Sequence, residues 1–278
     1  MNALGPGDDF GLFGPGSMAW KLHLEPALLV GGLRALMIQA LHPLAIAAVA
    51  DHSRYREDVW GRYARTSNYV VTTIFGTTRQ AQALGVRVRE VHRPIRGIDR
   101  VTGRPYAADD PDLLLWIHTT LVESFLASYR RFVEPLSTAD ADRYVAEMVR
   151  QAELVGLQAG QVPASEEANR RFIDSCRPEL MVTRPALEAV DTVLHPPLSV
   201  WRRPFWWVAG QAAISLMPDF TLHLLGMRRN PLAEAGVRPL VRRGAAFSRR
   251  HLRPPPVIVQ AQRRLAERGS AHFPGIAQ

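Results

Sequence analysis

One histidine lies in the middle of an apolar helical stretch. Residues 110–129 read DPDLLLWIHTTLVESFLASY, and His118 is the histidine in that run. At helical spacing its imidazole projects from the face that the helix buries, because the residues one and two turns away are apolar. These neighbours are Leu114, Leu121, Val122 and Phe125. A buried imidazole needs a partner for its ring nitrogens.

Two kinds of partner are open for His118. The first is a backbone carbonyl or a hydroxyl, which would make it an ordinary core histidine. The second is a haem iron, because an axial histidine on an apolar helix suits the apolar slot that a porphyrin needs. Taken by itself, the stretch favours the structural partner.

A second group of polar side chains lies in WGRYARTSNYVVTTIFG, residues 60–76. Arg62 and Thr66 are four residues apart, so they share one edge of the apolar arc of this helix, whereas Arg65 points further out. A guanidinium and a hydroxyl at the rim of a pocket could hold a haem propionate, polarise bound oxygen or meet solvent. Two more candidates, His42 and His52, do not have a zinc-ligand spacing, and each is a structural histidine by default.

The elements that must position these residues are predicted to be helices throughout. Apolar spacing of three and four residues recurs between breaks, with no sustained strand-like alternation. We expect a helix from about Ser53 to Ile74 with Ser53 as N-cap, and one from Pro111 to about Glu134 with Asp110 as N-cap. Ser137 or Thr138 caps another helix, and His42-Pro43 marks a helix end or kink. Residues 93–110 are predicted to form a long irregular connection.

The predicted organisation is one large helical domain over residues 17–252. A flexible Gly/Pro-rich leader over 1–16 precedes it, and a tail over 253–278, with room for one more helix, follows it. Pro26 to Ala50 is apolar but interrupted by Arg34, so we expect a buried core helix rather than a membrane span. No cleavable signal peptide is evident in the first 20 residues.

The segment from Trp201 to Trp207, WRRPFWW, has two interpretations. It could anchor the chain at a membrane interface, where tryptophan and arginine are favoured, or it could start an amphipathic core helix with arginines at its edge. The formal charge is +8. Lys21 is the only lysine among the 34 basic residues, and the arginines are spread along the chain, so nucleic acid is not an expected partner.

Other function classes are disfavoured by missing motifs. The single cysteine, Cys176, excludes an intramolecular disulfide and a cysteine-based zinc site, and it fits a reducing cytosol. The sequence has no Walker A motif, G-x-G-x-x-G, G-x-S-x-G or Glu-x-x-His. Nucleotide-dependent, α/β-hydrolase and di-iron chemistry are therefore not expected.

Four segments of the sequence, taken together, resemble a known protein family. The runs HPLAIAAVADHS, GRYARTSNYVVTTIFGT, HRPIRGIDRVTGRPYAADDPDLLLWIHTTLVESFL and PLSTADADRYVAEM occur in this order. They resemble the catalytic domain shared by rubber oxygenase (latex-clearing protein) and the mycophenolic-acid-pathway oxygenase, over roughly Gly14 to Met227. The resemblance implies an all-α, globin-like core that holds haem b. In the rubber-cleaving members it also implies oxidative cleavage of an isoprenoid double bond by dioxygen.

The resemblance also implies roles for individual residues. His118 in WIHTT matches the proximal ligand of the haem iron. Arg62, Arg65 and Thr66 in GRYART match the family's distal Arg-x-x-basic-Thr pattern, so Arg62 and Thr66 are expected in catalysis and Arg62 and Arg65 at the cofactor.

The chain departs from the rubber-cleaving relatives at two positions. Ile46 stands where rubber oxygenases carry a distal glutamate that is proposed as a base. Leu115 stands where those relatives tend to show a second histidine. His42 or His52 could take over a distal acid–base role, and His92 could lie near a propionate.

The resulting hypothesis is a haem-dependent oxygenase that uses dioxygen on a hydrophobic, isoprenoid- or lipid-like small molecule. The alternative is a non-catalytic helical lipid-binding protein, or one that docks on a membrane through Trp201 to Trp207. A cytoplasmic location is expected under both, with membrane association open. A homodimer is open as well.

Overall fold

Capping residues fix where the long helices begin. The Asp110 side chain accepts a hydrogen bond from the backbone N–H of Asp112, and a proline follows it at the first helical position. The Ser137 hydroxyl accepts one from the backbone N–H of Asp140. Both helices therefore begin where the sequence predicted.

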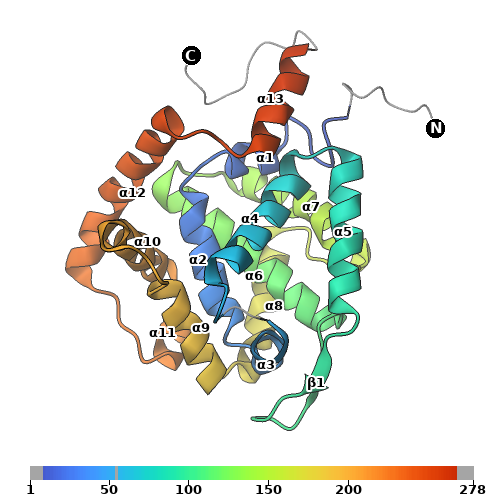
Figure 1. Ribbon diagram of the computed structural model, residues 1–278, viewed down its shortest axis with the longest axis vertical. Coiled ribbons are helices and arrows are strands. Elements are labelled where there is room, and N and C mark those ends of the chain that lie inside the picture. The colour runs from blue at the N-terminus through green and yellow to red at the C-terminus, as the bar shows by residue number, and fades with distance from the viewer. Residues whose placement is uncertain (1–8, 54–55, 268–278) are drawn as a thin grey trace.

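The computed structural model describes residues 9–53 and 56–267, and in these ranges the chain is almost entirely helical (Figure 1). The all-α prediction is confirmed. The α-helices are α1 (Met18–His23), α2 (Leu28–Gln39), α3 (Pro43–His52), α4 (Val59–Phe75), α5 (Thr78–His92), α6 (Pro111–Phe132), α7 (Thr138–Leu154), α8 (Glu166–Cys176), α9 (Arg184–Leu194), α10 (Arg203–Leu216), α11 (Asp219–Leu224), α12 (Pro231–His251) and α13 (Pro256–Glu267). Three short 3₁₀ helices are η1 (Ala159–Gln161), η2 (Arg177–Glu179) and η3 (Val200–Arg202).

Helix α6 runs through the middle of the molecule (Figure 1). It packs most extensively on α2 and also lies against α7, α8 and α12. Its buried residues enter separate apolar clusters: Trp116 packs with α2 and α3, whereas Val122 and Phe125 pack with α1, α4 and α7. The helix that carries His118 is therefore enclosed along most of its length.

The apolar segment 26–50 folds as two buried helices rather than one. Helices α2 and α3 are bent by 101° relative to each other at the break that precedes Pro43, where the sequence predicted a helix end or kink. Arg34 is buried but satisfied: its guanidinium donates to the Leu216 carbonyl, to Ser124 Oγ and to Glu123. Within the described ranges no single helix is long and apolar enough to cross a bilayer, although α2 and α3 pass that test as a bent pair.

Two local predictions were wrong. Ser53 is the C-cap of α3 and not the N-cap of the next helix. Helix α4 begins at Val59 with Asp58 as its N-cap, because the Asp58 carboxylate accepts the Gly61 N–H. The connection over residues 93–110 is not irregular either, since it holds an antiparallel hairpin of β1 (Arg96–Ile98) and β2 (Pro105–Ala107).

The ends of the described chain are tied to the helical body. The Asp9 carboxylate accepts hydrogen bonds from the backbone N–H and the hydroxyl of Thr78, at 2.8 and 2.7 Å. Asp9 is thus anchored, whereas the sequence predicted a flexible leader over residues 1–16, of which 1–8 lie outside the described part. In the predicted tail, α13 packs on α4, and Arg264 donates to the Phe75 carbonyl at 2.6 Å. Residues 268–278 also lie outside the described part.

Candidate functional site

His118 is a buried imidazole that the protein does not satisfy. It is 7% exposed, and its burial lowers its pKa to about 4. Within the described ranges its ring nitrogens make no hydrogen bond, yet neither is among the fully enclosed unpaired atoms, so both face some open space. At neutral pH the ring is uncharged, which is the form that binds a metal.

The neighbouring polar side chains on α6 behave differently. The hydroxyls of Thr119 and Thr120 donate to the carbonyls of Leu115 and Trp116, at 2.8 and 2.6 Å. Ser124 Oγ donates to the Thr120 carbonyl at 2.6 Å. These groups are satisfied inside their own helix, and His118 is not.

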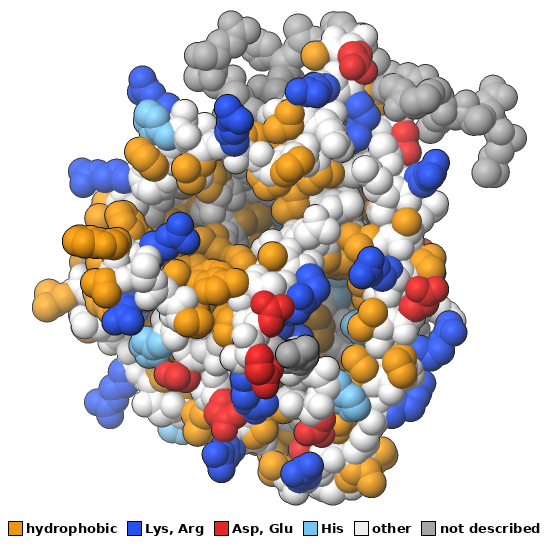
Figure 2. Space-filling model, viewed as in Figure 1, with side chains coloured by type: hydrophobic (Ala, Val, Ile, Leu, Met, Phe, Trp, Pro, Cys, Tyr) orange, Lys and Arg blue, Asp and Glu red, His pale blue; other side chains and the backbone are white. Residues whose placement is uncertain are grey.

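Helices α4 and α6, which carry Arg62 and His118, have different main packing partners. Helix α4 packs chiefly on α5, α13 and α1, whereas α6 packs chiefly on α2, α8 and α7. Figure 2 shows this face of the molecule hollowed between α4, α5 and α3, with histidine and arginine side chains visible in the hollow.

Arg62 lies near His92, on the neighbouring helix α5. Arg62 Nη1 donates to Ser53 Oγ at 2.6 Å, which ties α4 to the end of α3. Burial lowers the pKa of His92, and the charge of Arg62 lowers it further, whereas Asp109 raises it. The Nδ1 atom of His92 is buried without a partner. The structure therefore brings together Arg62 and His92, which the sequence could only name separately.

Arg65 and Thr66 lie farther out on α4. The Arg65 side chain is exposed and pairs with Asp58 at 3.0 Å, as expected for the outward-pointing member of the group. Thr66 lies one turn beyond Arg62 and is exposed. The structure thus separates an inner cation, Arg62, from an outer cation, Arg65.

His42 and His52 occupy opposite ends of α3, a helix about 15 Å long. His42 is buried, its Nδ1 has no partner, and its Nε2 lies 4.0 Å from Glu179 Oε2. Burial lowers its pKa, and the Glu179 charge opposes this shift. Its ring lies 6.0 Å from that of Trp116, two residues before His118 on α6. His52 is exposed at the other end of the helix, so the two histidines cannot act together on one bound group.

A tyrosine that the sequence reasoning missed joins the end of α3 to the hairpin. Tyr106 Oη donates to Asp51 Oδ2 at 2.7 Å and lies 3.2 Å from His52 Nε2. Burial, together with the hydrogen bond to Asp51, raises the pKa of Tyr106 to about 12. Only the hairpin brings Tyr106 to Asp51, and no local pattern signalled that hairpin.

The two positions that depart from the rubber-cleaving relatives are apolar and buried. Ile46 lies inside the core cluster of α3, and Leu115 packs with Leu114 and Ala152 of α7. Neither position offers a titratable group to the hollow.

The donor set fits haem better than a protein-bound metal ion. Among the described residues, no three His, Cys, Asp or Glu side chains are placed to share a metal ion. A haem iron takes its equatorial ligands from the porphyrin and needs an axial ligand from the protein. The His118 imidazole lies on an apolar helix and makes no hydrogen bond among the described residues, so it can meet that requirement.

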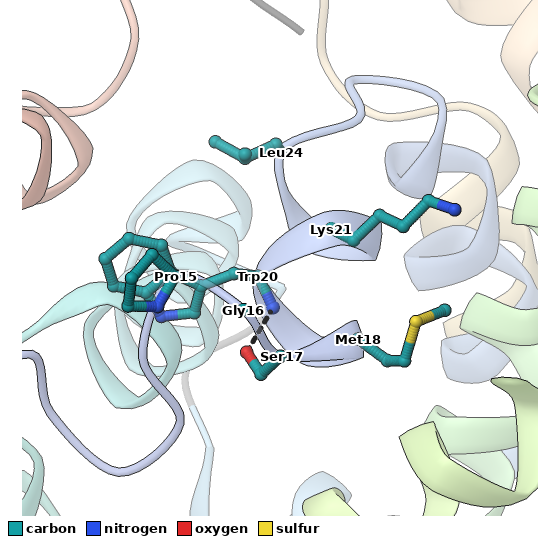
Figure 3. A pocket seen from close by; sticks show the side chains of 7 residues that line it. All are labelled: Pro15, Gly16, Ser17, Met18, Trp20, Lys21 and Leu24. Atoms are coloured by element: carbon teal, nitrogen blue, oxygen red, sulfur yellow. Dashed lines mark hydrogen bonds between the residues drawn. The ribbon is translucent and has the colours of Figure 1, made fainter. Parts of the chain in front are cut away.

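A separate small pocket lies at the start of α1 (Figure 3). Its volume is about 160 Å³, below the range of pockets that bind drug-sized ligands. The lining residues are Pro15, Gly16, Ser17, Met18, Trp20, Lys21 and Leu24. It contains no predicted site residue and is too small for a macrocycle.

Comparison with curated proteins and with solved structures gives no match. A family model does match, over residues 20–250, a range that includes every candidate residue. Its description is ER-bound oxygenase mpaB/B'/Rubber oxygenase, catalytic domain. The match confirms the resemblance seen in the sequence: the chain belongs to this family of oxygenase catalytic domains.

Proposed function

We propose that this protein is a haem b-dependent oxygenase that uses dioxygen on a hydrophobic, isoprenoid- or lipid-like small molecule. The observation that carries the proposal is the His118 ring, which is 7% exposed, uncharged at neutral pH and makes no hydrogen bond among the described residues. Membership of an oxygenase family supports the reaction class.

His118 would hold the cofactor through one ring nitrogen. Its lowered pKa keeps that nitrogen unprotonated over the physiological range. Apolar side chains one turn away on α6, Leu114 and Val122, would help to form the apolar slot beside that nitrogen. A bound haem would supply the activation of dioxygen, which the side chains of this chain cannot supply.

Arg62 would place a positive charge at the rim of the hollow. Its hydrogen bond to Ser53 and its closeness to His92 hold the guanidinium on the inner side of α4. There it suits a carboxylate of the cofactor, because a guanidinium binds a carboxylate through two hydrogen bonds. Thr66, one turn along, adds a hydroxyl on the solvent side, and Arg65 is too far out to add more than charge.

Proton handling would fall to the end of α3 rather than to a distal glutamate. Ile46 removes the carboxylate at the position where rubber oxygenases have one. Asp51, Tyr106 and His52 form a hydrogen-bonded chain instead, and Tyr106 can pass a proton between the carboxylate and the imidazole. His42 is buried at the other end of α3 and would serve to pack that end against α6.

The decisive experiment is a haem titration of the purified full chain, read by the Soret band and by a pyridine haemochrome assay. We expect one haem per chain for the wild type and for His23→Ala, which removes another enclosed histidine. We expect almost none for His118→Ala. A colourless His118→Ala together with a colourless wild type would instead support the lipid-binding alternative.

A second variant separates cofactor binding from turnover. In Arg62→Ala we expect weaker haem affinity but a retained Soret band at saturating haem, where oxygen consumption with an isoprenoid test substrate should fall at least about tenfold, the range expected for one positioned polar group. Unchanged oxygen consumption in Arg62→Ala would assign the guanidinium to structure alone.

A further inference from the structure

Large apolar side chains stand in solvent where α10 begins. Trp201 is 86% exposed, Phe205 80% and Trp207 53%, and Val200 beside them is exposed too. We call these four residues the aromatic face. Exposed tryptophans and phenylalanines in one cluster mark a binding surface more often than chance, because contiguous apolar patches are costly in water.

The aromatic face is held rigidly by the one tryptophan of the segment that turns inward. Trp206 Nε1 donates to the Val193 carbonyl at 2.9 Å. Its ring packs edge-on against Trp60 and Tyr63 of α4, with ring centroids 5.5 and 6.1 Å apart. Trp206 therefore fixes the start of α10 to the body, and its neighbours are left pointing outward.

Helix α12, which packs on α10, extends the exposed apolar surface. Only Val237 and Ala245 of α12 are buried, whereas Leu240 and Phe247 are exposed seven residues apart on one side of the helix. Arg243 stands between them on the same side. Figure 2 shows hydrophobic and arginine side chains mixed at the edge of the molecule where α10 and α12 lie.

The charge of this surface is strongly positive. Helix α12 contains five arginines and one acidic residue, Glu234. Arg202 and Arg203 lie inside the aromatic face, and both are exposed. Among the described residues none of Arg202, Arg203 and Arg243 has a carboxylate partner; the nearby acidic residue Asp191 pairs with His195.

We propose that the aromatic face and the exposed side of α12 together dock on an anionic lipid membrane. Indole rings favour the headgroup region, and arginine stems can lie in the apolar layer while the guanidinium meets lipid phosphate. A second copy of the chain fits less well, because a two-fold contact would set these arginines against the same arginines. The docking is peripheral and buries side chains without a spanning helix.

The surface connects directly to the candidate site. Trp60 and Tyr63, which pack on Trp206, belong to the same turn of α4 as Arg62. Docking would therefore bring the membrane within one helix of the hollow, so that an apolar substrate could pass from the bilayer to the site. This last step rests on the proposed function, whereas the docking itself does not.

Flotation of the full chain with lipid vesicles tests the docking without reference to haem or turnover. We expect the protein to float with vesicles of phosphatidylcholine and phosphatidylserine, and much less with phosphatidylcholine alone. Trp201→Ala/Phe205→Ala should lower the partition at least about tenfold. Arg202→Gln/Arg203→Gln should lower it roughly fivefold per arginine and weaken its salt dependence.

Ile98→Ala/Val101→Ala is the matched control, since both side chains are exposed on the distant hairpin. It should float like the wild type. Equal loss in the control, or no flotation of the wild type with either vesicle, would overturn the proposal. A concentration-dependent dimer that Trp201→Ala/Phe205→Ala dissolves, without vesicle binding, would assign the surface to a second copy.

A measurement on the wild type keeps the test independent of how the variants fold. Vesicles that contain brominated phosphatidylcholine quench tryptophans that enter the bilayer. Trp20 and Trp116 are buried in the core, so quenching must come from the exposed tryptophans. We expect quenching that requires phosphatidylserine, and its absence would contradict docking through the aromatic face.

Discussion

Two enclosed histidines, His23 and His118, lie in different surroundings. Burial lowers the pKa of His23 to about 3 and that of His118 to about 4. His23 Nε2 lies 3.0 Å from Tyr144 Oη, and its ring meets the edge of Phe125 at 4.8 Å. His118 has no such partner within the described ranges. A lowered pKa is common to both histidines, so it is the missing hydrogen bond, and not burial, that distinguishes His118 and motivates its proposed role as a haem ligand.

The two surroundings differ in the same way at other residues. Around His23, the helices α1 and α7 close on each other, and the Glu147 carboxylate accepts the Ala19 N–H at 2.8 Å. At the N-terminal end of α3 and the C-terminal end of α5, His42 Nδ1 and His92 Nδ1 are buried without partners. Unpaired polar groups cost stability unless a ligand or water meets them. Of the two, His42 lies beside α6, with its ring 6.0 Å from that of Trp116.

Chemical rescue should give the largest effect and would sharpen this comparison. In His118→Gly, haem binding should be lost almost completely, and added imidazole should restore the Soret band by taking the place of the ring. His23→Gly should keep the band without imidazole, because its ring already has a protein partner. Loss of the band in His23→Gly alone would reverse the roles of the two histidines.

The next largest effect should appear in the pH dependence of stability of haem-free protein. The folded-state pKa of His118 is below its unfolded value of 6.5. The contribution of the neutral ring to the free energy of unfolding is therefore complete above pH 6.5 and is lost as the pH falls towards 4. That contribution is roughly 3 kcal/mol. The free energy of unfolding, measured with urea, should therefore fall less between pH 7 and pH 4 in His118→Phe than in the wild type.

His23→Phe provides the matched case for this measurement. Because the pKa of His23 is also lowered, this variant should likewise reduce the dependence of the free energy of unfolding on pH. Haem binding should stay intact. An unchanged slope in both variants would show that the two rings are more open to water than the structure indicates.

A smaller effect is expected when the partner of His23 is removed. Tyr144→Phe deletes the hydroxyl at 3.0 Å and leaves the imidazole unpaired, which should lower the free energy of unfolding by about 1–3 kcal/mol. Thr119→Val is the control on the His118 side. The Thr119 hydroxyl bonds only carbonyls of its own helix, so we expect a change below about 1 kcal/mol. Equal losses of unfolding free energy in Tyr144→Phe and Thr119→Val would contradict the difference between the surroundings of His23 and His118.

The smallest effect should come from the outer cation of α4. Arg65→Gln breaks an exposed pair with Asp58 and should change the free energy of unfolding by less than about 1 kcal/mol, with unchanged haem affinity. Arg62→Gln should weaken haem binding measurably in a parallel titration. If Arg65→Gln lowered haem affinity more than Arg62→Gln does, the rim of the site would lie farther out on α4 than Arg62.

Sequence alone predicted the features that depend on near neighbours. The helix that begins at Pro111 follows from Asp110 and the proline, and the burial of His118 follows from the leucines one turn away. Where the decisive residue was distant or the cap ambiguous, the prediction was wrong. Ser53 looked like an N-cap, yet Asp58 takes that place, and the hairpin that carries Tyr106 left no pattern because each of its strands has only three residues.

The sequence by itself thus determined an all-α chain with an imidazole on a buried helical face, and its motif order determined the family. Only the tertiary structure decided that this imidazole meets no carbonyl, that Arg62 lies beside His92, and that Tyr106 reaches Asp51. The physical reason is the range of the interactions. Caps and apolar stripes act within a few residues, whereas hydrogen bonds between α3, α4 and the hairpin depend on how distant segments pack.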